Sequence, residues 1–180
     1  MSDALLIIDM QNFVLERIQR GVNYYPTNCI ENMQIILAKF RDAGKPVLHV
    51  RHHSVEAGSL LHQDSSQAQV ISLFAELPGE PVFIKNTSSA FSSSSLLSHL
   101  KSKDLSRLTV VGAVAGFCVS STVRMGSDLG FEMRVVKDAV ISFDLEGTQV
   151  SALDIYNVTL ALLESDFAHL VAIDDLQLTE

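Results

Sequence analysis

The chain has 180 residues, of which 47% are hydrophobic and 19% charged, values typical of one folded domain (residues 1–180) and not of a disordered chain. The formal net charge of −8 argues against nucleic-acid partners, because phosphate binding needs clustered Lys and Arg. No apolar run approaches the roughly 18 residues of a membrane span, and the N-terminal segment lacks the basic region of a signal peptide. Cys29 and Cys118 form no disulfide framework, so we expect a cytoplasmic protein without a membrane partner.

Short apolar strands alternate with amphipathic helices along the chain. The expected strands are Ala4–Ile8, Val47–Arg51, Pro81–Ile84, Leu108–Val111, Phe131–Val136 and Leu170–Ile173. The expected helices are Ile30–Phe40, Leu96–Lys101, Cys118–Leu129 and Val150–Leu163, with a polar loop over Ser54–Gln69. This alternation predicts an α/β fold with right-handed crossovers, a three-layer, doubly wound arrangement in which helices cover both faces of a mostly parallel six-stranded sheet.

Three chemically distinct side chains follow the ends of predicted strands: Asp9, Lys85 and, after the small-residue turn that begins at Gly112, Cys118. In an open parallel sheet the carboxyl ends of the strands form the ligand-binding edge, so these side chains should converge there. A thiol at a helix start is expected to favour the thiolate, the nucleophilic form. Asp9 is then a candidate general base and Lys85 its orienting cation. Taken alone, Asp9 could instead cap a turn, and Lys85 could form a surface ion pair. The presence of both together with Cys118 favours a catalytic role.

Aromatic and basic residues near these positions are candidates for substrate binding. Phe13, Phe91 and Phe117 could form an apolar wall, although ordinary core packing explains them equally well. Arg51 or His52 is expected to line the pocket and to meet a polar or anionic substrate. Cys29 precedes an amphipathic helix and is interpreted as an inert buried thiol.

The motifs resemble those of the isochorismatase-like cysteine hydrolases, in order and over nearly the whole chain. They are Leu6-Ile-Ile-Asp-Met-Gln-Asn12, Ile84-Lys85 with Ser89-Ala-Phe91, Val110-Val-Gly-Ala-Val-Ala-Gly-Phe-Cys-Val119, Asp128-Leu-Gly130 and Val136-Lys-Asp-Ala139. The family includes nicotinamidases, N-carbamoylsarcosine amidohydrolases and ureidoacrylate amidohydrolases. The resemblance implies a doubly wound fold, an Asp9–Lys85–Cys118 triad, and a cis peptide at Ala113–Val114.

The same resemblance implies a mechanism and an assembly. Backbone N–H groups of Val114 and Cys118 would hold the oxyanion while a small amide, carbamoyl or ureido C–N bond is cleaved through a Cys118 thioester. The partner would be a small-molecule substrate. Members of the family are commonly dimers or larger, so a homodimer or homotetramer is expected.

Two departures from the family pattern narrow these expectations. Isochorismatases proper cleave a vinyl ether without a cysteine nucleophile. The presence of Cys118 therefore argues against isochorismate as the substrate. Nicotinamidases carry a metal-binding Asp-x-His after the second strand, where this chain has His52 and Ser54. The imidazoles of His49, His52, His53 and His62 suit zinc, but adjacent strand residues point to opposite faces. We therefore predict no metal and no other cofactor.

Three other functions are alternatives to an amide hydrolase. They are an isochorismatase-type hydrolase of another small metabolite, a non-catalytic binding protein on the same fold, and a nucleotide-binding oxidoreductase. The last is disfavoured because the first strand leads into Asp9-Met-Gln-Asn12 without a Gly-x-Gly-x-x-Gly turn. All three triad positions are filled, which disfavours the binding protein.

Overall fold

A seven-stranded sheet forms the centre of the computed structural model, which describes residues 2–178. The strands follow the order β2-β6-β5-β1-β3-β4, and β7 also pairs with β6. All pairs are parallel except β2 with β6, which confirms the predicted mostly parallel sheet. The strands are β1 (Ser2–Ile8), β2 (Tyr24–Tyr25), β3 (Val47–His52), β4 (Val82–Lys85), β5 (Leu105–Ala113), β6 (Glu132–Phe143) and β7 (His169–Val171).

The prediction of six strands was wrong by one. The additional strand is β2, which pairs antiparallel with the end of β6, Tyr24 opposite Phe143. Two residues are too few to show an alternating pattern, so the sequence gives no signal for it. This pairing is possible because β6 continues to Phe143, well beyond the predicted end at Val136.

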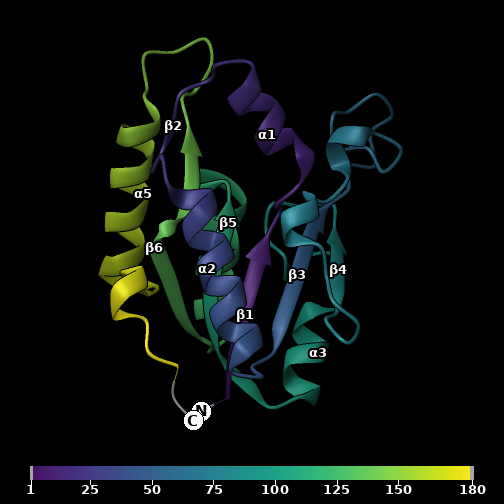
Figure 1. Ribbon diagram of the computed structural model, residues 1–180, viewed down its shortest axis with the longest axis vertical. Coiled ribbons are helices and arrows are strands. Elements are labelled where there is room, and N and C mark those ends of the chain that lie inside the picture. The colour runs from purple at the N-terminus through teal and green to yellow at the C-terminus, as the bar shows by residue number, and fades with distance from the viewer. Residues whose placement is uncertain (1, 179–180) are drawn as a thin grey trace.

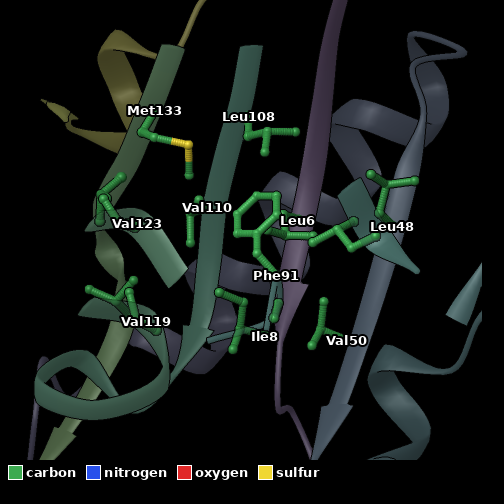
Figure 2. Close-up of a cluster of buried hydrophobic side chains, with 14 of the residues drawn as sticks. Leu6, Ile8, Leu48, Val50, Phe91, Leu108, Val110, Val119, Val123 and Met133 are labelled. Carbon is green, nitrogen blue, oxygen red and sulfur yellow. The ribbon is translucent and has the colours of Figure 1, made fainter. Parts of the chain in front are cut away.

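Five helices cover the two faces of the sheet (Figure 1). Their bounds are α1 (Asn12–Gln19), α2 (Cys29–Asp42), α3 (Leu96–Ser102), α4 (Ser120–Asp128) and α5 (Ala152–Asp166). Side chains of α1 and α2 pack with one face of the sheet, and side chains of α3, α4 and α5 pack with the other. Figure 2 shows part of the core on the face covered by α3, α4 and α5, where Leu6 and Val110 from the strands belong to the same apolar cluster as Val119 and Val123. The predicted three-layer architecture is therefore confirmed.

The carboxyl ends of four neighbouring strands, β5, β1, β3 and β4, lie at one edge of the sheet, the upper edge in Figure 1. Helix α1, which was not predicted, begins directly beyond β1 at this edge. The segment between β3 and β4 contains only short 3-10 turns at Ser66–Ala68 and Ser72–Phe74, consistent with the predicted polar loop. Within residues 2–178, the helices are too short or too polar to cross a bilayer.

Candidate active site

Asp9, Lys85 and Cys118 meet at the edge where the strands end. Lys85, the last residue of β4, places its Nζ 2.8 Å from Asp9 Oδ2 and 3.2 Å from Cys118 Sγ. Asp9 directly follows β1, and Cys118 lies in a π-helical turn, Ala115–Val119, between β5 and α4. The side chains of Asp9 and Lys85 are almost wholly buried. An acid, a cation and a thiol that are distant in sequence thus share one small volume.

The backbone at this edge is shaped by a close contact between β1 and β5. Gly112 has φ +125°, and a Cβ there would lie 2.1 Å from the carbonyl oxygen of Ile8. Only glycine permits this approach, which brings the turn carrying Cys118 beside the end of β1. Asp9 itself has φ +51°, so the chain turns sharply as it leaves the strand. Its N–H still donates to Val50 O at 2.9 Å, which fixes Asp9 beside β3.

Burial raises the pKa of both the acid and the thiol. The pKa of Cys118 is raised to about 12, by burial and then by the negative charge of Asp9, with Lys85 opposing. The pKa of Asp9 is also raised, by burial, against the favourable charge of Lys85. The expectation of a resting thiolate is therefore wrong, because burial and a neighbouring carboxylate outweigh the helix start. The arrangement instead pairs a thiol with a base whose proton affinity is increased.

Lys85 is surrounded by more acceptors than it has protons. Its Nζ lies within hydrogen-bonding distance of four atoms: Asp9 Oδ2 at 2.8 Å, His52 Nδ1 at 3.1 Å, Thr87 O at 3.1 Å and Cys118 Sγ at 3.2 Å. An ammonium has three N–H donors and accepts no hydrogen bond. His52 Nδ1 must therefore be the unprotonated ring nitrogen when it pairs with Lys85. Burial and then the charge of Lys85 lower the pKa of His52, which keeps its ring neutral.

Gln11 holds the end of the strand that carries His52. This role of Gln11 was not predicted from the sequence. Its Oε1 accepts from His52 N at 2.8 Å, and its Nε2 donates to His52 O at 2.9 Å and to Ala68 O at 2.6 Å. The Gln11 side chain is completely buried. Its burial, which the sequence does not show, explains these contacts, because buried polar groups are normally hydrogen-bonded.

The predicted substrate-binding residues fall in different places. His52 joins the cluster through Lys85, whereas the guanidinium of Arg51 pairs with Glu76. Phe91 is 6% exposed, stacks on Phe131 at 5.6 Å and lies between Leu6 and Val110 in Figure 2. Phe91 thus packs in the core and Arg51 is engaged by Glu76, so their binding of substrate stays a prediction without support from these contacts.

The other two aromatic candidates differ in exposure. Phe13, near the start of α1, is half-buried and packs against the core on the α1–α2 face. Phe117, directly before Cys118, is 52% exposed. Of the three predicted aromatic residues, Phe117 is the one that is openly accessible beside the thiol.

The turn that carries Cys118 begins with an unusual backbone. The Ala113–Val114 peptide bond is cis. Val114 O then accepts from Phe117 N at 2.9 Å and from Val119 N at 3.3 Å, closing the π-helical turn. Val114 and Cys118, the two expected oxyanion donors, therefore belong to the same tight turn.

One group of side chains has the composition of a metal site. The ligand atoms of Asp9, His52 and Cys118 lie within 4.8 Å of one another, and residues 2–178 contain no other such group. Lys85 Nζ contacts all three of these atoms, so a cation of the chain itself occupies the position that a metal ion would take. His49 is engaged elsewhere, 2.9 Å from Glu80.

Comparison with known proteins assigns the chain to a family. The profile of the isochorismatase domain matches residues 3–166. The chain belongs to the isochorismatase family. The members of this family are hydrolases, and the match spans every residue of the cluster described above.

Similar proteins cover nearly the whole chain. A secreted isochorismatase effector, Isc1 of Verticillium dahliae, is 30% identical over 97% of this chain and 90% of its own length. Nicotinamidase 3 of Arabidopsis thaliana is 26% identical over 97% of this chain and 86% of its own. The crystal structure of an isochorismatase-family protein from Chromobacterium violaceum has a TM-score of 0.89 at 28% identity, covering 97% of this chain and 91% of the other. The fold and the family are thereby established together.

Proposed function

We propose that this isochorismatase-family hydrolase cleaves a small amide, carbamoyl or ureido C–N bond through a thioester on Cys118. The observation that carries this proposal is the contact of one buried ammonium, Lys85 Nζ, with both Asp9 at 2.8 Å and Cys118 at 3.2 Å. Acyl transfer needs a nucleophile with a base in reach, and this cluster supplies both. The name of the related plant nicotinamidase supports an amide as the bond that is broken.

The mechanism begins with a proton transfer inside the cluster. Asp9 takes the proton of Cys118, and the sulfur attacks the carbonyl carbon as the C–O π electrons move to oxygen. The N–H groups of Val114 and Cys118 hold this oxyanion. The C–N bond then breaks, and Asp9 returns the proton to the leaving nitrogen. In the second half, Asp9 deprotonates water, which cleaves the thioester and restores the thiol.

A cavity next to Lys85 supports a small, polar substrate, although Asp9 and Cys118 are not among its lining residues. It has a volume of about 400 Å³, lies beside the end of β4 and is lined by backbone or side-chain atoms of Lys85, with polar groups from His53, His62, Asn86 and Ser93. This volume is at the lower end of the range for small-molecule sites. Phe117, the residue directly before Cys118, is exposed and is the aromatic side chain that we propose for an apolar contact with the substrate.

The test is a hydrolysis screen of small primary amides, carbamoyl compounds and ureido compounds, with ammonia release as the measurement. The expected result is release from at least one class by the wild-type enzyme and none above background by Cys118→Ala and Cys118→Ser. Cys29→Ala is the matched control, because Cys29 is the second thiol and is buried in the core. It should retain wild-type turnover.

Two outcomes would contradict the proposal. Undiminished ammonia release by Cys118→Ala would remove the nucleophile from the mechanism. Binding of screen compounds without release of ammonia, in calorimetry on the same samples, would favour a non-catalytic binding protein.

We further infer that the protein acts in the cytoplasm as a homodimer or homotetramer. Both cysteines are free, as a thiol-dependent enzyme in a reducing compartment requires. Helix α5 exposes Leu153, Val158 and Leu162, and these apolar side chains suit a contact between subunits. Light scattering coupled to gel filtration measures the assembly; a monomer at micromolar concentration would contradict it. The fungal relative is described as secreted, so fractionation of the source cells tests the compartment.

A further inference from the structure

Lys85 offers three N–H groups to four acceptors, and this mismatch has a chemical consequence. The acceptors are Asp9, His52, Thr87 O and Cys118, all within 3.2 Å of Nζ. The three donors of an ammonium point in fixed tetrahedral directions, so one acceptor is always left without a proton. Which acceptor is left out depends on where the negative charge lies.

In the resting cluster the thiol is the weakest competitor. Asp9 is charged and closest to Nζ, and Thr87 O is a backbone carbonyl; both accept strongly. A neutral imidazole nitrogen is a good acceptor, whereas the sulfur of a thiol is a poor one. If Asp9, Thr87 and His52 each accept one N–H of the ammonium, the sulfur of Cys118 is left without one, although it lies 3.2 Å from Nζ.

We infer that His52 competes with Cys118 for the Lys85 ammonium and thereby keeps Cys118 a thiol until Asp9 takes its proton. When that proton leaves Sγ and binds a carboxylate oxygen of Asp9, the negative charge passes from Asp9 to sulfur and Lys85 stays protonated. The neutral Asp9 then becomes the weakest acceptor. The third N–H turns from Asp9 to Cys118, while His52 and Thr87 hold the ammonium in place throughout.

The structure provides what this role requires of His52. Gln11 fixes its backbone on both sides, through His52 N at 2.8 Å and His52 O at 2.9 Å. The titratable groups around the ring are Lys85, Asp9, His53 and Cys118. The carboxyl oxygen Asp9 Oδ1 is buried and makes no hydrogen bond within the described chain, so it is free to receive the thiol proton. His52 is thus a positioning residue that acts through Lys85.

The inference rests on the proposed function for its purpose, but its test needs no substrate. The rate of Cys118 alkylation by iodoacetamide is followed against pH by mass spectrometry of the peptide that contains Cys118. His52→Leu removes the competing acceptor and frees an N–H for sulfur. The midpoint of the rate profile should therefore fall by about one pH unit or more, since a hydrogen bond to a charged group stabilises that charge.

Two matched variants separate this effect from a change in fold. His52→Asn retains an acceptor near the position of Nδ1, so its midpoint should stay near that of the wild type. His169→Leu replaces an exposed histidine on β7, away from the cluster, and should leave the midpoint unchanged. An unchanged or raised midpoint in His52→Leu, or an equal shift in His52→Asn, would overturn the inference.

A measurement on the unmodified protein covers the case in which His52→Leu does not fold. Nitrogen-15 chemical shifts of the His52 ring at neutral pH report which nitrogen carries the proton. The inference requires a proton on Nε2 and none on Nδ1, and a protonated Nδ1 would overturn it. If no amide is hydrolysed in the screen while the alkylation midpoint shifts as expected, the proposed function fails and the competition for the ammonium stands.

Discussion

Two carboxylates, one at each end of the sheet, have opposite surroundings. Glu80, at the amino ends of β3 and β4, accepts from Arg41 Nε and Nη2 at 2.8 Å, from His49 at 2.9 Å and from Leu77 N at 2.9 Å. Burial alone would raise the pKa of Glu80, but these donors together lower it to about 2. Asp9, at the carboxyl ends, has the single cation Lys85, and burial raises its pKa.

The comparison separates a structural ion cluster from a reactive one. Every oxygen of Glu80 is held by donors, so its charge is fixed and protonation is resisted. Asp9 has one oxygen without a partner among the described residues and a thiol in reach. The cavity at the Glu80 end is the larger, about 570 Å³ against about 400 Å³ beside Lys85. The active site that we propose therefore rests on the proton-transfer groups around Asp9 and not on cavity volume.

The largest expected effect on turnover follows from removing Lys85, the cation beside Asp9. Lys85→Met leaves the buried Asp9 carboxylate without a counter-charge, so Asp9 binds a proton and no longer serves as the base. We expect kcat/KM for ammonia release to fall by about 1000-fold or more, as for members of other catalytic clusters. Adding Asp9→Asn should recover stability in urea unfolding but no activity. Substantial turnover by Lys85→Met would place the base elsewhere.

The pH dependence of turnover is the next largest effect. The base must be ionised, so kcat/KM should rise with pH through the pKa of Asp9 and fall about tenfold per pH unit below it. Because burial raises this pKa above the ordinary 3.8, the inflection should lie above pH 3.8. Glu80→Gln should show the same profile. An inflection below 3.8, measured as initial rates across pH, would contradict the raised pKa of the base.

Breaking the structural cluster should affect stability and spare activity. Glu80→Gln removes the charge that Arg41 pairs with, and we expect a loss of about 2 to 3 kcal/mol in the free energy of unfolding, with kcat/KM within about twofold of wild type. Urea unfolding and ammonia release measure the two quantities. A large loss of turnover in a folded Glu80→Gln protein would show that the Glu80 cluster affects catalysis at the opposite end of the sheet, and would contradict this prediction.

This stability difference has a defined dependence on pH. The pKa of Glu80 is lowered from 4.5 to about 2 in the folded protein, so the unfolded chain binds the proton first. The contribution of Glu80 is therefore complete above pH 4.5 and is lost as the pH falls towards 2. The difference between wild type and Glu80→Gln should shrink over that range and stay constant at neutral pH.

The smallest effect is expected for His49→Gln. Burial lowers the pKa of His49, so the ring is neutral and donates one hydrogen bond to Glu80, which Arg41 continues to hold. Gln retains an N–H donor. We expect a loss of about 1 kcal/mol or less in urea unfolding and unchanged turnover. A loss as large as that of Glu80→Gln would mean that His49 supports the cluster beyond this single bond.

The sequence predicted the parts of this molecule that follow from strand order. Asp9, Lys85 and Cys118 each follow an apolar run, and parallel strands carry such positions to one edge. Two features escaped prediction because they depend on three-dimensional placement. The ring of His52 meets Lys85 only because β3 and β4 align these residues, and Gln11 reaches His52 across neighbouring strands.

Other differences have local causes. Helix α1 begins at Asn12 with no capping hydrogen bond from the side chain of Gln11, so its start carried no signal. Strand β6 passes through the polar pair Lys137 and Asp138, where the prediction ended it. The sequence shows the helix start near Cys118 but not the burial beside Asp9, which raises the pKa of the thiol.

The most direct test of the central claim is the detection of an acyl group on Cys118. Enzyme mixed with a compound that releases ammonia in the screen is quenched in acid during turnover and examined by mass spectrometry. The account predicts an added acyl mass on the peptide containing Cys118 and no adduct in Cys118→Ala. Rapid turnover with that peptide unmodified at every quench time, and retained by Cys118→Ala, would contradict it.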